Sequence, residues 1–145
     1  MPSKLYGQFL SQALNKEIDW DTDTIKVALL TNAYTPDQDA HNYLDDVVTH
    51  EVTGATGYTA GGITLANKTN TYNSASNVIV LDADDVTWSS STITARYAVV
   101  YDASPSTNAT RPLIGYVDFG SDQSSSNGNF TITWDATGIV RITVA

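Results

Sequence analysis

The two histidines are the side chains of this sequence best suited to proton transfer or metal binding near neutral pH. His41 and His50 lie nine positions apart, with Asp45 and Asp46 between them. Two metal ligands on one face of a helix are normally three or four positions apart, and this spacing does not provide that arrangement. We therefore expect two surface histidines and no metal site.

Alternating aspartates form a second group of candidate ligands. Asp19, Asp21 and Asp23 have the spacing of the first ligands of an EF-hand calcium loop. That loop needs glycine at its sixth position and glutamate at its twelfth, where this chain has Thr24 and Leu30, so an EF-hand is excluded. A second cluster consists of Asp82, Asp84 and Asp85. Either cluster could hold a hard cation loosely, or could consist of turn-forming residues at strand ends.

Motifs typical of catalysis or phosphate binding are absent from the sequence. No serine lies in a G-x-S-x-G elbow, and the glycine-rich residues 54–62 lack the G-K-[ST] ending of a phosphate-binding loop. We interpret these glycines as turn residues, with Tyr58 anchoring the loop on the domain. Nothing selects one glycosidase pair among the 16 acidic residues. The sequence predicts a non-enzymatic protein without catalytic or cofactor-binding residues.

Charge and composition narrow the partners and the compartment. The chain has 145 residues, a formal net charge of −9 and no cysteine. A negative surface repels phosphate backbones and anionic lipids, so we expect neither nucleic acid nor membrane as a partner. Without cysteine, disulfides and thiolate metal sites are excluded. The first residues lack the apolar core of a signal peptide, so we expect synthesis in a cytoplasm.

Two short helices are predicted in the N-terminal third. Residues 5–16 fit an amphipathic helix, because apolar side chains recur there with a period near 3.6. Residues 35–49 are predicted as a second helix, because Thr35, Pro36 and Gln38 fit the capping residue, the first helical position and the capping box. The main apolar stripe of the first helix consists of Leu5, Tyr6, Phe9, Leu10 and Leu14.

The rest of the chain is dominated by β-strand patterns. Residues 24–31 form a predicted strand with two apolar faces, which is typical of a buried strand. Residues 92–101 alternate most clearly, and residues 130–134 and 139–144 are expected to pair as a C-terminal hairpin. About six to eight closely spaced strands predict one mainly β domain over residues 1–145. We expect an antiparallel β-sandwich or a barrel-like fold that carries the two helices.

The tryptophans bear on one class of binding protein. A carbohydrate-binding β-sandwich module would use exposed, coplanar aromatic rings as stacking platforms. Trp134 alternates with Phe130 and Ile132 and is predicted to lie in the core. Trp20 and Trp88 lie beside Asp and Ser in predicted turns, so we expect their rings to be nearer the surface.

Six stretches of the sequence together form one pattern. These are IKVALLT (25–31), YTPDQDAH (34–41), EV (51–52), GYTAGG (57–62), TITARYAVVYD (92–102) and RPLIGYVDFG (111–120). Together they resemble small virion proteins of tailed bacteriophages, which are encoded among head and tail structural genes. The resemblance covers most of the chain from about residue 24 onward, and none of the stretches is a catalytic signature.

This resemblance implies a structural part of the virion that is made in the bacterial host. It implies a capsid decoration (cement) protein or a minor tail or tail-tube-associated protein, and the small, acidic, compact chain favours decoration. Decoration proteins are commonly homotrimers that bind the major capsid protein. We expect the first helix to supply the partner contact, and the alternative is that it covers the sheet of its own domain. The candidate contacts are Leu5, Tyr6, Phe9, Leu10 and Leu14.

Overall fold

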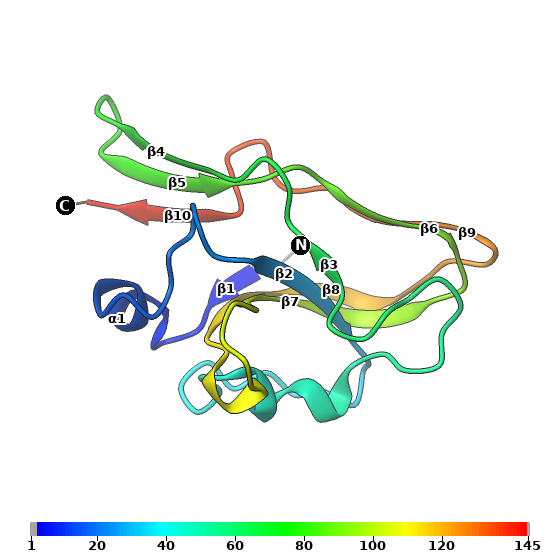
Figure 1. The fold of residues 1–145 in the computed structure, drawn as a ribbon. Helices are drawn as coiled ribbons and strands as arrows, with labels where there is room; N and C mark the ends of the chain where they lie inside the picture. Colours follow the sequence, from blue (N-terminus) through cyan, green and yellow to red (C-terminus); the bar gives the residue numbers. More distant parts are fainter. Residues whose placement is uncertain (1–2, 145) are drawn as a thin grey trace.

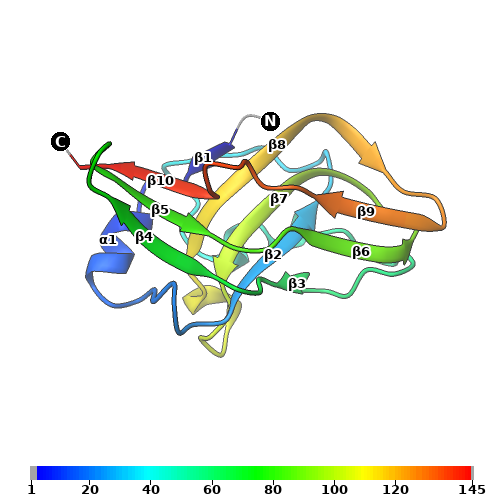
Figure 2. The ribbon, with the colours of Figure 1, turned by 90° about the horizontal axis from the view of Figure 1, so that it is seen from above.

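Antiparallel strands build most of the computed structural model, which describes residues 3–144. Strands make up 44% of the structure and helical turns 11%, which confirms the prediction of a mainly β protein. Figures 1 and 2 show two layers of strands packed face to face, with irregular segments beneath the lower layer. No sheet within residues 3–144 closes on itself, so the barrel alternative is wrong.

The lower layer is a five-stranded sheet with the order β1-β8-β7-β2-β3. Side chains of β2 enter two cores: Val27 and Leu29 pack between the layers, and Leu30 packs beneath the sheet. This confirms the prediction of a buried strand with two apolar faces. The strands are β1 (Ser3–Leu5), β2 (Ile25–Leu30), β3 (Ile63–Thr64), β7 (Thr94–Asp102) and β8 (Leu113–Ser124).

Two smaller sheets, β10-β5-β4 and β6-β9, form the upper layer. The predicted C-terminal hairpin is wrong, because β9 pairs with β6 and β10 pairs with β5. The turn between β9 and β10 is present, with Gly138 N–H donating to Asp135 O at 2.8 Å, but the two strands that it connects do not pair with each other. An alternating pattern specifies a strand and not its partner. The strands are β4 (Thr69–Asn73), β5 (Val78–Asp82), β6 (Val86–Ser91), β9 (Gly128–Ile132) and β10 (Val140–Thr143).

The predicted helix over residues 5–16 is too long. Within residues 3–144 the only α-helix is α1 (Phe9–Leu14), and the chain before it forms the edge strand β1. This strand can approach β8 because Gly115 has no side chain, and a Cβ there would lie 2.9 Å from Lys4 O. The helix ends before Lys16, which takes a left-handed φ of 63°.

The second predicted helix, over residues 35–49, is also wrong. This segment consists of turns and two short 3₁₀ helices. Aspartate side chains take the backbone donors that a helix would use, because Asp37 accepts from the N–H groups of Asp39 and Ala40, and Asp46 accepts from two N–H groups before it. The 3₁₀ helices of the structure are η1 (Leu44–Asp46), η2 (Val48–His50) and η3 (Asn108–Thr110).

Candidate interaction surface

The side chains best suited to proton transfer lie in the core beneath the lower sheet. Tyr6 OH and Tyr34 OH are 2.8 Å apart, and Tyr34 OH lies 3.0 Å from His41 Nδ1. His50 packs against the same tyrosine, with ring centroids 5.9 Å apart. Burial raises the pKa of Tyr34 to about 12 and the pKa of Tyr6 well above its usual range, so both hydroxyls stay neutral. The histidines are half-buried against one tyrosine, and not on the open surface as expected.

A second hydrogen-bond network fixes the glycine-rich loop. Glu51 Oε1 accepts from Tyr58 OH and from Gly61 N–H, each at 2.6 Å, and Tyr58 OH accepts from Leu29 N–H at 3.0 Å. Burial, followed by the hydrogen bond to Glu51, raises the pKa of Tyr58 far above its usual range. These bonds confirm the prediction that Tyr58 anchors this loop.

The two acidic clusters accept hydrogen bonds from nearby groups of the fold. Asp19 Oδ1 accepts from two backbone N–H groups of its own turn at 3.1 Å. Asp84 Oδ2 accepts from Asn67 Nδ2 at 2.6 Å, and Asp85 Oδ1 accepts from Trp134 N–H at 2.9 Å. Within residues 3–144, no group of three or more His, Cys, Asp or Glu side chains is arranged to hold a metal ion. Turn formation accounts for the contacts of Asp19, whereas Asp84 and Asp85 hydrogen-bond segments that are distant in sequence.

The five apolar side chains predicted as partner contacts divide into inward and outward groups. Tyr6 and Phe9 are buried, and Leu5 packs half-buried against the main core, so these three cover their own domain. Leu10 and Leu14 point outward, with 44% and 85% of their surface exposed. Of the five candidates, these two are the ones that the fold leaves largely exposed.

Two further apolar side chains are exposed at the same end of the molecule. Tyr72 on β4 is 57% exposed and Val144, just after β10, is 46% exposed. Figures 1 and 2 both show α1, the β4–β5 hairpin and the C-terminal end of β10 gathered at this end. We call Leu10, Leu14, Tyr72 and Val144 the apolar end. Sequence reasoning missed Tyr72, because it lies in a strand of otherwise polar residues.

Sheet register explains why Tyr72 faces solvent. Tyr72 pairs with Ile79, and Ile79 pairs with Ile142, so the three side chains share one face of the β10-β5-β4 sheet. Ile79 and Ile142 pack partly against the main core. The sheet extends past the lower layer at the α1 end, as Figure 1 shows. At the apolar end, the face of the upper layer that elsewhere packs against the core is therefore exposed to solvent.

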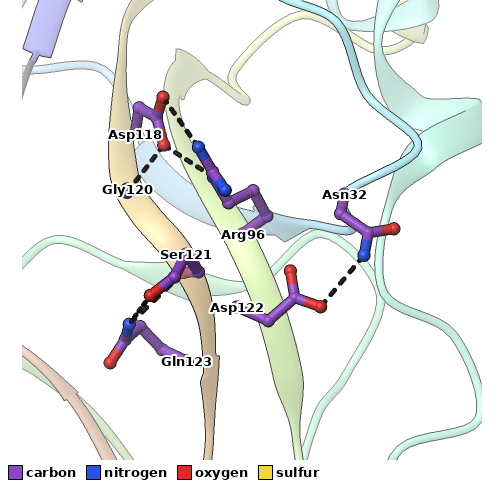
Figure 3. Close-up of polar contacts among 7 residues, drawn as sticks. All are labelled: Asn32, Arg96, Asp118, Gly120, Ser121, Asp122 and Gln123. Carbon is purple, nitrogen blue, oxygen red and sulfur yellow. Dashed lines mark hydrogen bonds and ion pairs between the residues drawn. The ribbon is translucent and has the colours of Figure 1, made fainter.

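The opposite end of the molecule is polar, and Figure 3 shows its main contacts. Arg96 Nε donates to Asp118 Oδ1 at 2.7 Å, and Gly120 N–H donates to the same oxygen at 2.7 Å. These bonds, led by that from Arg96, hold the pKa of Asp118 below its usual range. Asn32 Nδ2 donates to Asp122 Oδ2 at 2.9 Å. The contacts stabilise a bulge of β8 at which Gly120 takes a φ of 82°.

A cleft of about 400 Å³ opens between the edge strands β1 and β10. Lys4 on β1, Arg141 on β10 and the half-buried Trp134 border it. Trp20 and Trp88 lie in the main core with 6% and 4% of their surface exposed, so the expectation of surface rings is wrong for both. Trp134 packs only partly against the core, so its predicted burial is partial.

A search of protein families, curated proteins and solved structures finds no match to this chain. The candidate surface therefore rests on the chain's own geometry. Over the described part of the chain, residues 3–144, no helix has the length and apolar character needed to cross a membrane.

Proposed function

We propose that this protein is a non-enzymatic structural component of a tailed-bacteriophage particle: a capsid decoration (cement) protein with an open β-sandwich fold that binds the major capsid protein. The apolar end is the observation that carries the proposal. Its side chains, led by Leu14 with 85% of its surface exposed, gain about 25 cal/mol for each Å² that a partner covers. The resemblance of the sequence to small virion proteins supports the same class.

The use of the reactive side chains also supports a structural role. His41 is hydrogen-bonded to Tyr34, and Glu51 is hydrogen-bonded to Tyr58 and to a loop N–H group. Each of these groups holds one part of the fold on another. A general acid or base must instead reach a proton of a bound substrate.

We propose a homotrimer as the binding unit. Among residues 3–144, the apolar end of one copy presents four large apolar side chains, Leu10, Leu14, Tyr72 and Val144. Three copies that engage equivalent coat subunits add avidity without new kinds of contact. A minor tail or tail-tube-associated protein is the alternative, in which the same end contacts a tail subunit. The carbohydrate-binding alternative is weakened, because the rings of Trp20 and Trp88 are buried.

The test is mass spectrometry of purified particles of the parent phage, with heads and tails separated. We expect stoichiometric copies in the head fraction. Copies confined to the tail fraction would favour the alternative, and absence from both fractions would end the proposal. Size measurement of the purified protein tests the trimer, and a strict monomer at high concentration would contradict it.

A pair of variants tests the surface. The double substitution Leu10→Asp and Leu14→Asp should abolish rebinding to heads that lack the protein, while circular dichroism stays unchanged because both side chains are exposed. Ser126→Asp, an exposed residue of the loop between β8 and β9, is the matched control and should rebind normally. Normal rebinding of the double variant would show that another surface makes the contact.

A further inference from the structure

A buried carboxylate at the end of β7 has one oxygen without a partner. Asp102 is the last residue of that strand, and none of its surface is exposed. Its Oδ1 accepts from Ser104 N–H at 2.8 Å, whereas its Oδ2 is buried without a hydrogen-bond partner. An unpartnered buried carboxylate oxygen is costly, and a bound ion, a water molecule or a proton is the usual remedy.

A second carboxyl group lies beside that of Asp102. Asp23 precedes β2, whose first residue, Ile25, pairs with Asp102, and the two carboxyl groups can share a hydrogen bond when one is protonated and repel when both are ionised. Asp23 is half-buried, whereas Asp102 is fully buried. Asp23 Oδ2 accepts from Asp19 N–H at 2.7 Å.

The surrounding charges leave an excess of negative charge. Lys68 Nζ donates to Asp23 O and its charge lowers the pKa of Asp19, whereas the charge that acts on Asp102 is the negative charge of Asp23. The facing carboxylates of Asp23 and Asp102 carry a charge of −2 when both are ionised. One divalent cation would neutralise this excess.

We propose that Asp23 and Asp102 bind one hydrated divalent cation of the hard class, Ca²⁺ or Mg²⁺. Asp102 Oδ2 is the inner ligand, the Asp23 carboxylate is the outer ligand, and water completes the coordination. Hard cations prefer carboxylate oxygens and keep bound water when the protein supplies only one or two carboxylates. This site is independent of the virion role, because it lies on β7 and the turn before β2 and not at the apolar end.

A proton shared by the two carboxyl groups is the competing explanation. Burial, then the hydrogen bond to Asp23 and the negative charge of Asp23, raise the pKa of Asp102 to about 6. A shared proton would hold the two carboxyl groups together whether or not a divalent cation is added, whereas a cation site makes the stability of the fold depend on added Ca²⁺ or Mg²⁺.

Thermal unfolding at pH 7.5 tests the site directly. Against EDTA, 1 mM CaCl₂ or MgCl₂ should raise the Tm by about 4 °C if the Kd is near 0.1 mM. Asp102→Asn and Asp23→Asn should each abolish the shift, and the second keeps the test open if the first fails to fold. Asp21→Asn is the matched control in the same turn, because its side chain is exposed, and it should keep the full shift.

Terbium luminescence gives a second readout of the same site. Trp20 lies three positions before Asp23, so we expect it to sensitise the emission of bound Tb³⁺, and excess Ca²⁺ should quench the signal by displacing Tb³⁺. The proposal fails if neither the Tm nor the luminescence responds. It also fails if the response survives in both Asp102→Asn and Asp23→Asn.

Discussion

Replacing Gly62 by alanine should destabilise the protein severely, because the backbone of β2 occupies the space that a Cβ would need. Gly62 has a φ of 72°, and its Cβ would lie 1.8 Å from Val27 O, far inside the 3.0 Å limit of real contacts. The chain must therefore shift by more than 1 Å at the residue that leads into β3. That shift separates β3 from β2, whose pairing joins Val27 to Ile63 and Lys26 to Thr64.

The size of the loss follows from three contributions. An alanine with left-handed φ costs roughly 1–2 kcal/mol. Loss of two or three β2–β3 hydrogen bonds, including Leu65 N–H to Ile25 O at 2.8 Å, adds about 1 kcal/mol each. Steric strain in the packed sheet adds roughly 1–3 kcal/mol. We expect Gly62→Ala to lower the free energy of unfolding by at least about 4 kcal/mol.

Gly54→Ala is the matched control, because it isolates the backbone contribution. Gly54 has a φ of 67° and nothing lies within 4 Å of the Cβ position, so only the cost of about 1–2 kcal/mol remains. Urea unfolding followed by the fluorescence of the buried Trp20 and Trp88 measures both variants. Equal losses for the two variants would refute the steric reasoning.

Three further predictions concern burial and charge. Phe9→Ala should cost about 3–5 kcal/mol, whereas Leu14→Ala should change stability by less than about 0.5 kcal/mol, because the first side chain is buried and the second is exposed; urea unfolding checks both. Arg96→Ala should lower the stability only slightly, since its ion pair with Asp118 is partly solvated, and the difference from wild type should shrink in 1 M NaCl; a loss that is unchanged by salt would contradict this. In EDTA, the pKa of Asp102 is about 6 in the folded protein against an ordinary value of 3.8, so protonation of Asp102 stabilises the fold. This contribution to the free energy of unfolding is complete below pH 3.8 and is lost as the pH rises through 6. The free energy of unfolding of Asp102→Asn, relative to that of wild type, should therefore increase by up to about 3 kcal/mol between pH 4 and pH 7.5. A constant difference across that range would show that Asp102 does not titrate in this way.

The local sequence pattern was sufficient to predict elements whose conformation depends on residues that are neighbours in the chain. The two apolar faces of residues 24–31 predicted β2, which lies between two cores. The glycine pattern predicted the loop that Tyr58 anchors, because positive φ values favour glycine whatever the partner. The mainly β character followed from the same local preferences.

Contacts distant in sequence decided the features that the pattern missed. Trp20 was expected near the surface, but its indole N–H donates to Thr69 O at 3.0 Å, a partner 49 positions away. The predicted capping residue Thr35 begins no helix, because the side chain of Asp37 accepts from the N–H groups of Asp39 and Ala40 and forms a turn instead. Asp102 gave no signal, because only the approach of the turn before β2 makes its carboxyl group unusual. The apolar end likewise depends on how far the upper sheet extends past the lower one.

The edges of the two layers differ in how they oppose the growth of fibrils. On the cleft side, β1 carries Lys4 and β10 carries Arg141, so a strand from another molecule would have to accommodate a cation. On the other side, β3 is only two residues long and offers little for a strand to pair with. In the β10-β5-β4 sheet, the other edge, β4, has five exposed residues and no charge. When many copies crowd together, β4 opposes intermolecular sheet extension less than β1, β3 or β10 does.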